Sequence, residues 1–461
     1  MSPTTSTPSA TATATALDIV RDLFADVEPR DFEVRLWDGT RWTPEGAGAP
    51  AFTLVLERPS TLRRLLRTGS ESALLEAYLA GDLSVQGDIF AVPDVGRAVI
   101  ERQRPLTERA RLALRLLRLP REPAGDGDVA DADVAEDGAA DVRTARLRGE
   151  LHSIERDRAA VTYHYDLSNR FYGLFLDPRM VYSCAVFAAP DEPLERAQLR
   201  KLDLICRKLR IRPGDRLLDV GCGWGALILH AAREYGADAL GITVSERQAD
   251  LARQRIRDAG LEDRCRVVVR DYRTMGEAEG GFDRVASVGM FEHVGRARAG
   301  EYFRTIFQLL RPGGVYLHHA ITGNPRQERP AGASLSDRYV FPDHELIPIG
   351  ETLTAAEMAG FDVRDVEGLG EHYALTLRRW VAALEGRRSE AVSEVGEATV
   401  RAWLLVFAGA AVDFEAGRQG LAQALLVRPR EDGSTGLPLG RWDWYDASPR
   451  FDGPGGAVTS R

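Results

Sequence analysis

The chain has 461 residues, of which 44% are hydrophobic and 28% charged, an ordinary globular composition with enough length for two or more domains. Its formal net charge of -9 argues against a general nucleic-acid binder, and no apolar run approaches the ~20 residues that span a bilayer. The four cysteines, at positions 184, 206, 222 and 265, form no C-x-x-C pair. We therefore expect no disulfide, no metal site and a reducing, cytoplasmic location.

The N-terminal region predicts a tail followed by a small domain. Residues 1–16 lack the basic and apolar parts of a secretory signal, and we expect them to be a disordered tail. Residues 17–99 are expected to form a small α+β domain. Alternating apolar residues predict strands at 32–37 and 51–56, and the stretch 72–80 predicts a helix.

Residues 100–142 have an unusual charge pattern. Eight arginines lie among leucines between positions 97 and 121, and a helix there would place Leu112, Leu116 and Leu119 on one side. A second side would hold Arg111, Arg115 and Arg118. Such a cationic amphipathic helix can lie on an anionic membrane, although a helix that packs on its own protein fits equally well. The acidic stretch 122–141 has almost no large apolar residue and is expected to be a flexible linker.

Residues 143–430 predict an α/β domain with a doubly wound, mostly parallel sheet. The expected strands are 216–220, 238–243, 265–270, 282–288 and 314–320, with two further candidates near 361–367 and 372–378, and the expected helices are 224–235, 245–259 and 299–310. Residues 322–350 interrupt this order and are expected to form a cap. Trp403, Phe407, Ala410 and Phe414 recur at helical spacing and predict core or a subunit interface, and 431–461 is expected to be a tail.

The sequence LLDVGCGWG at 217–225 predicts a buried strand, a tight glycine turn and a helix. The G-x-G-x-G spacing is not the dinucleotide fingerprint, and it carries no Lys-Ser/Thr for a triphosphate. With Asp219 before Gly221, Gly223 and Gly225, it resembles the first motif of class I S-adenosylmethionine-dependent methyltransferases. A glycine turn used only for packing is the alternative.

Polar residues follow the next two predicted strands. Thr243, Ser245 and Gln248 stand where many methyltransferases bind the cofactor ribose. Ser245 with Gln248 could equally form a helix capping box, and the two roles can coexist. Asp271 is positioned to read an adenine amino group, or it is an ordinary turn aspartate.

Seven segments, taken together and in order, carry a closer resemblance. They are YHYDLSNRFYGLFLD (163–177), VYSCAVF (181–187), LLDVGCGWG (217–225), GITVSERQ (241–248), RDYR (270–273), SVGMFEHVG (287–295) and RYVFPDHELIP (338–348). They closely resemble the cyclopropane-fatty-acyl-phospholipid synthases and the related mycolic-acid methyltransferases, over about 163–380. The small N-terminal domain also resembles that of the phospholipid-acting synthases, whereas the mycolic-acid enzymes are shorter.

The resemblance implies roles for individual residues. The implied contacts to S-adenosylmethionine are Tyr182, Ser183, Asp219, Gly221, Gly223, Gly225, Thr243, Ser245, Gln248, Asp271 and Tyr272. The implied catalytic cluster, which holds a bicarbonate ion in these enzymes, is Cys184, Glu292, His319, Ile321 and Tyr373. His318 competes with its neighbour in the alignment. Without the resemblance, Glu292 could be a helix N-terminal charge and Cys184 a small buried residue.

The resemblance also implies a reaction. One carbon of S-adenosylmethionine is added to the cis double bond of an acyl chain in membrane phospholipid, and a carbocation closes to a cyclopropane. Aromatic walls would protect the cation, and the candidates are Tyr163, Tyr165, Phe171, Tyr172 and Phe175. A peripheral enzyme on the inner, anionic membrane face and a homodimer are further expectations. A methylene- or methyl-branched product, a small-molecule methyltransferase and a non-catalytic membrane-binding protein are the alternatives.

Overall fold

The small N-terminal domain is built on a four-stranded sheet. The computed structural model describes residues 10–63, 71–102, 106–119, 147–165, 167–327 and 335–445. The small sheet contains β1 (Phe32–Arg35), β2 (Arg41–Trp42), β3 (Phe52–Leu56) and β4 (Leu83–Gly87), in the order β2-β1-β3-β4. Helices α1 (Ala10–Phe24) and α3 (Glu71–Leu79) complete it. The rings of Phe24 and Phe32 meet at a centroid distance of 5.1 Å, which joins α1 to the sheet.

A seven-stranded sheet carries the large domain. Its strands are β5 (Arg216–Val220), β6 (Asp238–Thr243), β7 (Cys265–Val269), β8 (Phe282–Val288), β9 (Leu310–Gly323), β10 (Asp362–Gly368) and β11 (Gln419–Val427). The order is β10-β11-β9-β8-β5-β6-β7, and only β11 runs antiparallel to its neighbours. The order reverses at β5, so a ligand is expected at the carboxyl end of that strand. The predicted doubly wound, mostly parallel sheet is confirmed.

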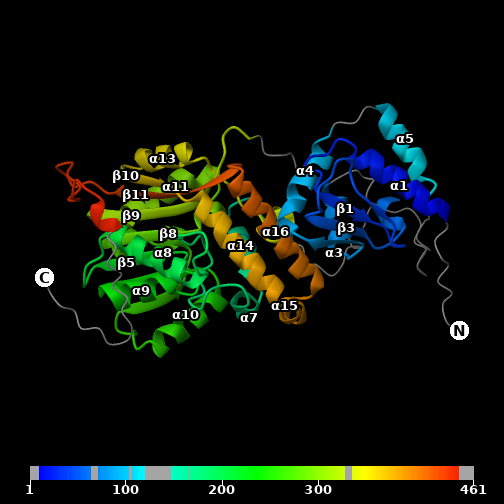
Figure 1. Cartoon of the computed structure of the whole chain (residues 1–461). Helices are drawn as coiled ribbons and strands as arrows, with labels where there is room; N and C mark the ends of the chain where they lie inside the picture. Colours follow the sequence, from blue (N-terminus) through cyan, green and yellow to red (C-terminus); the bar gives the residue numbers. More distant parts are fainter. Residues whose placement is uncertain are drawn as a thin grey trace.

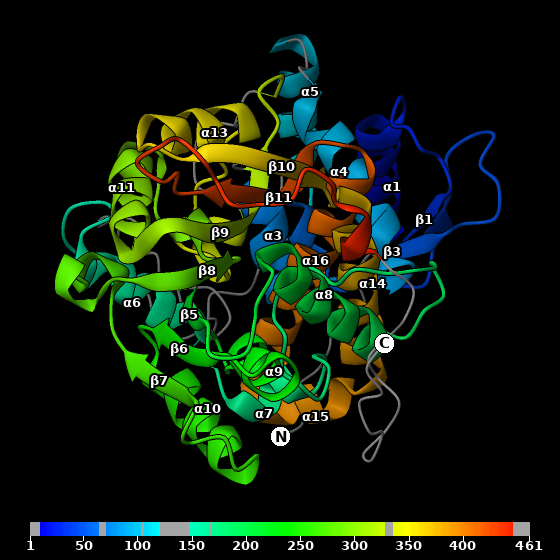
Figure 2. The same ribbon diagram turned by 90° about the vertical axis from the view of Figure 1, so that its left-hand side faces the viewer.

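Helices cover both faces of this sheet (Figure 2). They are α6 (Ile154–Tyr165), α7 (Asn169–Gly173), α8 (Leu194–Leu209), α9 (Ala226–Tyr235), α10 (Glu246–Asp258), α11 (Ala299–Leu309), α12 (Leu335–Tyr339), α13 (Ile349–Met358), α14 (Gly370–Gly386), α15 (Arg388–Val395) and α16 (Glu397–Glu415). Alternate strand residues face opposite sides. Leu217 therefore packs with the core of α8 and α9, and Leu218 with that of α11.

Helices α14 and α16 lie between the two sheets (Figure 1). The buried Trp403 and Phe407 of α16 confirm the predicted apolar stripe. From the same helix, Arg401 donates to the carbonyl oxygens of Tyr78 and Leu83 at 2.9 and 3.2 Å. The small domain is therefore docked on the helical side of the large one by directed hydrogen bonds.

The basic segment is two helices, α4 (Val92–Glu101) and α5 (Leu106–Leu116), rather than one. Leu116 is buried, whereas Leu114 and Leu117 are each 64% exposed. Several arginines pair with acids of this same chain: Arg97 with Asp413 at 2.7 Å, Arg102 with Asp26 at 2.8 Å, and Arg115 with Asp22. One side of α5 thus packs on its own protein, and another side stays open.

Two predicted boundaries are wrong. The tail assigned to 1–16 is too long, because α1 begins at Ala10 and buries Ala16 completely. The strand expected near 372–378 belongs to helix α14, whose buried Ala374, Leu377 and Val381 follow a helical repeat. Seven residues are too few to distinguish the two-residue repeat of a strand from the 3.6-residue repeat of a helix.

Two C-terminal features were not predicted. Strand β11 lies between β10 and β9 in the large sheet, and no strand was predicted for its apolar residues. Within the expected tail, Trp444 is only 5% exposed and Asp443 pairs with Arg210.

The acidic linker at 122–141 lies outside the described residues. Among the helices in the described ranges, none is long and apolar enough to cross a membrane.

Candidate active site

The chain turns sharply after β5, at Gly221, Gly223 and Gly225. Their φ angles are +83°, +53° and +81°, a region that favours glycine. A Cβ on Gly221 would lie 2.8 Å from the side chain of Met290. The backbone therefore lies bare between β5 and α9, where a ligand can approach closely.

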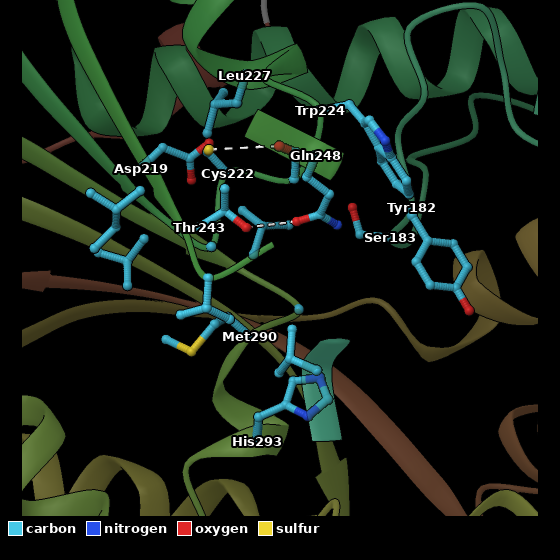
Figure 3. Close-up of a pocket in the computed structure, with 18 of the residues that line it drawn as sticks. Tyr182, Ser183, Asp219, Cys222, Trp224, Leu227, Thr243, Gln248, Met290 and His293 are labelled. Atoms are coloured by element: carbon cyan, nitrogen blue, oxygen red, sulfur yellow. Dashed lines mark hydrogen bonds between the residues drawn. The ribbon is translucent and has the colours of Figure 1, made fainter. Parts of the chain in front are cut away.

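A pocket opens at the carboxyl ends of β5, β6, β7 and β8 (Figure 3). The predicted cofactor residues that line it are Tyr182, Ser183, Asp219, Gly221, Gly223, Thr243, Gln248, Asp271 and Tyr272. Gly225 and Ser245 lie outside the lining. Gly225 starts α9 in a left-handed conformation, and the Ser245 hydroxyl caps α10 by accepting from the Gln248 backbone N–H at 3.3 Å. These two residues shape the pocket through helix ends. Ser245 is an N-cap as predicted, but the reciprocal bond of a capping box is absent, because the Ser245 backbone N–H donates to Thr243 instead of Gln248.

Hydrogen bonds fix the side chains at the end of β6. The Thr243 hydroxyl donates to Gln248 Oε1 at 2.7 Å and accepts from the Ser245 backbone N–H at 3.2 Å. Figure 3 shows this pair at the centre of the pocket, with Asp219 on one side and Tyr182 on the other. Because Oε1 is engaged, the NH2 group is the part of the Gln248 amide that can donate to a polar ligand edge.

Asp271 is tied to a neighbouring arginine. Arg273 donates to both of its carboxylate oxygens, at 2.9 and 2.6 Å, and also pairs with Asp157 of α6 at 3.0 Å. Asp271 and Asp157 both line the pocket. A carboxylate has lone pairs beyond those that Arg273 uses, so Asp271 can still accept from an adenine amino group.

A buried lysine and a buried aspartate both line the pocket. Lys201 of α8 is 2% exposed and donates to the Ser183 hydroxyl at 2.8 Å. Burial lowers the pKa of Lys201 to about 8 and raises the pKa of Asp219, 3% exposed, to about 7. Both side chains line the pocket, so it offers one cation and one titratable acid to a zwitterionic ligand.

Aromatic rings form the wall beside this pair. Tyr165, Tyr182 and Trp224 line the pocket, and Tyr182 packs on Trp380 at a centroid distance of 5.1 Å. Of the predicted aromatic wall, Phe171, Tyr172 and Phe175 are buried behind the lining, and Tyr163 is half-buried outside it. In the expected cap, Phe341 stacks on His164 at 4.2 Å. Aromatic rings therefore make up much of this side of the pocket and the layer behind it.

The predicted catalytic residues gather behind the pocket lining. Cys184 is fully buried, Glu292 is 7% exposed and His319 is 1% exposed. The Ile321 backbone N–H donates to Glu292 Oε1 at 2.7 Å. Burial, followed by the nearby Cys184 and Glu292, raises the pKa of Tyr373 well above its ordinary value. The cluster is assembled from segments that lie far apart in the sequence.

Two polar atoms of this cluster are unpaired. Glu292 Oε2 and His319 Nε2 are buried and have no hydrogen-bond partner within the part of the chain that the structure describes. Burial raises the pKa of Glu292 and lowers that of His319 well below its usual range. Unsatisfied buried polar atoms are costly, which favours a ligand between them.

Neighbouring residues of the same motifs point elsewhere. His318 faces the opposite side of the sheet, where its Nδ1 meets the Tyr316 hydroxyl at 2.9 Å. His293 lines the pocket, whereas Glu292 does not. The assignment of His319 rather than His318 is therefore consistent with strand alternation. No group of three His, Cys, Asp or Glu in the described ranges is arranged to hold a metal ion.

Sequence reasoning missed three buried residues of the site: Lys201, Lys208 and Gln423. The two lysines are seven residues apart on α8, on the face that also buries Ile205. Lysine at that spacing on an apolar face was an available signal, because buried lysines are rare and need partners. Gln423 gave no such signal, since β11 itself was missed.

Comparisons with known proteins agree with this geometry. The sequence profile of a family described as mycolic acid cyclopropane synthetase matches residues 152–424. A probable fatty acid methyltransferase of Pseudomonas putida is 39% identical over 415 residues, 89% of this chain and 95% of that protein. Another, of Mycobacterium tuberculosis, is 35% identical over 426 residues, 92% of this chain and 97% of its own length.

A solved structure extends the agreement to three dimensions. It is a mycolic acid cyclopropane synthase in complex with SAH and CTAB, 35% identical, covering 58% of this chain and 97% of its own, with a TM-score of 0.55. The family profile covers more than half of this chain, including the whole glycine turn and the catalytic cluster. The chain belongs to the mycolic acid cyclopropane synthetase family, and its large domain has the class I S-adenosylmethionine-dependent methyltransferase fold.

Proposed function

We propose that this protein transfers one carbon from S-adenosylmethionine to the cis double bond of an acyl chain in membrane phospholipid and closes a cyclopropane ring. The chain is an S-adenosylmethionine-dependent lipid methyltransferase. The proposal adds the phospholipid substrate and the cyclopropane product. The observation that carries it is the pair of buried, unpaired atoms, Glu292 Oε2 and His319 Nε2, behind an aromatic pocket.

The pocket residues fit the cofactor. The Asp219 carboxylate offers negative charge to the cationic part of S-adenosylmethionine, and the Lys201 ammonium offers a donor to its carboxylate. The Gln248 amide nitrogen is positioned in the pocket lining to donate to a ribose or base edge. These side chains are already oriented by bonds to Ser183 and Thr243, so little rearrangement is needed on binding.

The aromatic wall fits the carbon chemistry. An isolated alkene is a weak nucleophile, so it must be held in line with the sulfonium methyl. Methyl transfer then leaves a carbocation on the acyl chain, which water would quench. The faces of Tyr165, Tyr182 and Trp224 stabilise positive charge and exclude water.

The cluster is suited to bind an anion that acts as the proton acceptor. Ring closure requires loss of a proton from the transferred methyl group, and bicarbonate, when bound, supplies a base for it. One bare donor on His319 and one bare acceptor on Glu292 suit an anion that both accepts and donates hydrogen bonds. The Cys184 thiol stays protonated, because burial raises its pKa. Cys184 is therefore a contact of the cluster and not a nucleophile.

A second product is favoured by the names of the relatives. Two proteins that match almost the whole chain are called probable fatty acid methyltransferases. The same carbocation can lose a proton elsewhere and give a methylene- or methyl-branched chain. The choice depends on which proton the base reaches.

Mass spectrometry with a fully deuterated methyl donor tests both products. Phospholipid vesicles are incubated with the labelled cofactor, and the acyl chains are fragmented. A product that retains two deuteriums and resists mild hydrogenation of alkenes supports the cyclopropane. Retention of three deuteriums means a methyl branch and overturns the assigned proton loss. Labelled small molecules without labelled lipid would overturn the substrate.

We also propose peripheral binding to anionic membranes through α5. Leu114 of α5 and Leu117, directly after the helix, are exposed and lie close in the chain to the exposed Arg111 and Arg118, while Leu116 is turned inward. Exposed leucines beside arginines match the interface-binding pattern of amphipathic helices. Flotation with vesicles of increasing anionic lipid content tests this, and binding that ignores lipid charge would contradict it.

A further inference from the structure

A row of buried polar side chains crosses the sheet beside the catalytic cluster. His319 on β9, Gln423 on β11 and Glu367 on β10 are direct cross-strand partners. Lys208 of α8 reaches this row and, like His319 and Gln423, is 1% exposed. Buried polar groups must be matched donor to acceptor, so the direction of each hydrogen bond is informative.

Lys208 determines the direction of the hydrogen bonds along this row. Its Nζ lies 2.9 Å from Gln423 Oε1, and an ammonium group can only donate. The oxygen of the Gln423 amide therefore faces Lys208, and the NH2 group faces the other way. The amide oxygen and nitrogen have similar shapes, but the ammonium donor of Lys208 identifies which of the two is the oxygen.

The orientation of the Gln423 amide in turn determines which ring nitrogen of His319 carries the hydrogen. Gln423 Nε2 lies 3.1 Å from His319 Nδ1. Because the NH2 group only donates, Nδ1 must accept and carries no hydrogen. A neutral imidazole with a bare Nδ1 carries its hydrogen on Nε2. That nitrogen is the buried, unpaired one that belongs to the cluster.

The outer end of the row is anchored as well. Lys208 forms an ion pair with Glu367, whose other oxygen accepts from the Tyr445 hydroxyl at 2.7 Å. The Lys208 ammonium also lies 5.6 Å from the centroid of the Trp444 ring. The C-terminal segment thus holds Lys208 in place from the side away from His319.

We infer that Lys208 and Gln423 are positioning residues that hold His319 as its Nε2–H tautomer, so that His319 donates to an anionic base and is not the base itself. An Nε2 that already bears a hydrogen has no lone pair in the ring plane for a substrate proton. Deprotonation then falls to the anion held between His319 and Glu292. The catalytic consequence rests on the proposed function, whereas the tautomer does not.

Nitrogen-15 NMR of the histidine ring tests the tautomer in the wild-type protein. The full chain is labelled at histidine nitrogens, and the His319 signals are assigned by their loss in His319→Gln. The expected spectrum shows a protonated Nε2 and a bare Nδ1 near neutral pH. A protonated Nδ1, or a doubly protonated ring, overturns the inference without any appeal to activity.

A near-isosteric variant tests the consequence. In Gln423→Glu the side chain can only accept, so His319 should carry its hydrogen on Nδ1 and present a bare Nε2 to the anion. We expect kcat to fall on the order of 10²-fold, with cofactor affinity and lipid KM within about twofold and a higher bicarbonate requirement. Wild-type turnover with an inverted NMR signature would overturn the positioning role.

The control is the same change elsewhere on β11. Gln419 starts this strand, pairs with Gly323 and donates to the Ala410 carbonyl oxygen at 3.2 Å. Gln419→Glu should keep turnover within about twofold and leave the His319 spectrum unchanged. An equal loss in both variants would mean that the effect comes from charge on β11 and would overturn the inference. Absence of any cyclopropane product from the wild type, with the Nε2–H spectrum intact, would instead overturn only the proposed function.

Discussion

The cofactor pocket and the catalytic cluster lie side by side but are built in opposite ways. The pocket is made from turns that directly follow strands, such as Gly221 after β5 and Gln248 after β6. Several of its polar side chains bond to residues a few positions away, as Thr243 does to Gln248 and Asp271 does to Arg273. The cluster joins Cys184, Glu292 and His319 from distant segments and leaves two atoms unpaired.

This contrast indicates that cofactor binding depends on the pocket and that the chemical step depends on the cluster. In the pocket, the hydrogen bonds that hold Thr243, Lys201 and Asp271 before a ligand binds reduce the cost of ordering these side chains on binding. A cluster with bare buried atoms carries an unfavourable free energy that a bound anion would remove. Changes in the cluster should therefore affect turnover, and changes in the glycine turn should affect cofactor binding.

The largest expected effect is that of Glu292→Gln. It keeps the shape and the bond from the Ile321 backbone N–H but removes the negative charge of the carboxylate. We expect turnover to fall by about 10²- to 10⁴-fold, with cofactor affinity within about twofold. Turnover assays and isothermal titration calorimetry measure the two effects. A parallel loss of cofactor affinity would break the separation between the pocket and the cluster.

Gly221→Ala should have the converse effect. The positive φ costs about 1–3 kcal/mol for a residue with a Cβ, and the new methyl would lie 2.8 Å from Met290. We expect about a tenfold or greater loss of cofactor affinity. Gly260→Ala is the control, because its φ is +64° but nothing lies within 4 Å. Equal losses in the two variants would assign the effect to general strain.

The affinity for S-adenosylmethionine should depend on pH through Asp219. Burial raises the pKa of its carboxyl group to about 7. The carboxylate form attracts a cationic ligand, so affinity should rise as pH increases through 7, by about tenfold between pH 6 and 8. Calorimetry across that range measures it, and Asp219→Asn should flatten the profile. A flat wild-type profile would contradict the role of this charge in the pocket.

The smallest expected effect is on α5, far from both sites. Leu114→Gln with Leu117→Gln should weaken vesicle binding a few-fold and change stability by no more than about 0.5 kcal/mol. Leu116→Ala, which removes a buried side chain of the same helix, should instead destabilise the protein by about 2–5 kcal/mol. Vesicle flotation and thermal unfolding separate the two. Unchanged flotation of the double variant would assign α5 to packing alone.

The positions along the chain of the strands around the pocket could be predicted because each strand carries a local signal. The apolar run before Gly221 and the polar end of β6 are strong over a few residues. The prediction failed where the local signal was ambiguous. The stretch 372–378 alternates over too few residues to distinguish strand from helix, and β11 is a short apolar run that also fits a buried helix.

The sequence by itself determined the glycine turn, the parallel sheet and the residue types that a methyltransferase pocket needs, because these depend on neighbours in the chain. Only the tertiary structure showed that His318 faces the other side of the sheet and that Gln423 stands beside His319. Strand alternation assigns the face, and the register of β11 against β9 assigns the partner. Register is set by the packing of whole elements, so no local pattern specifies it.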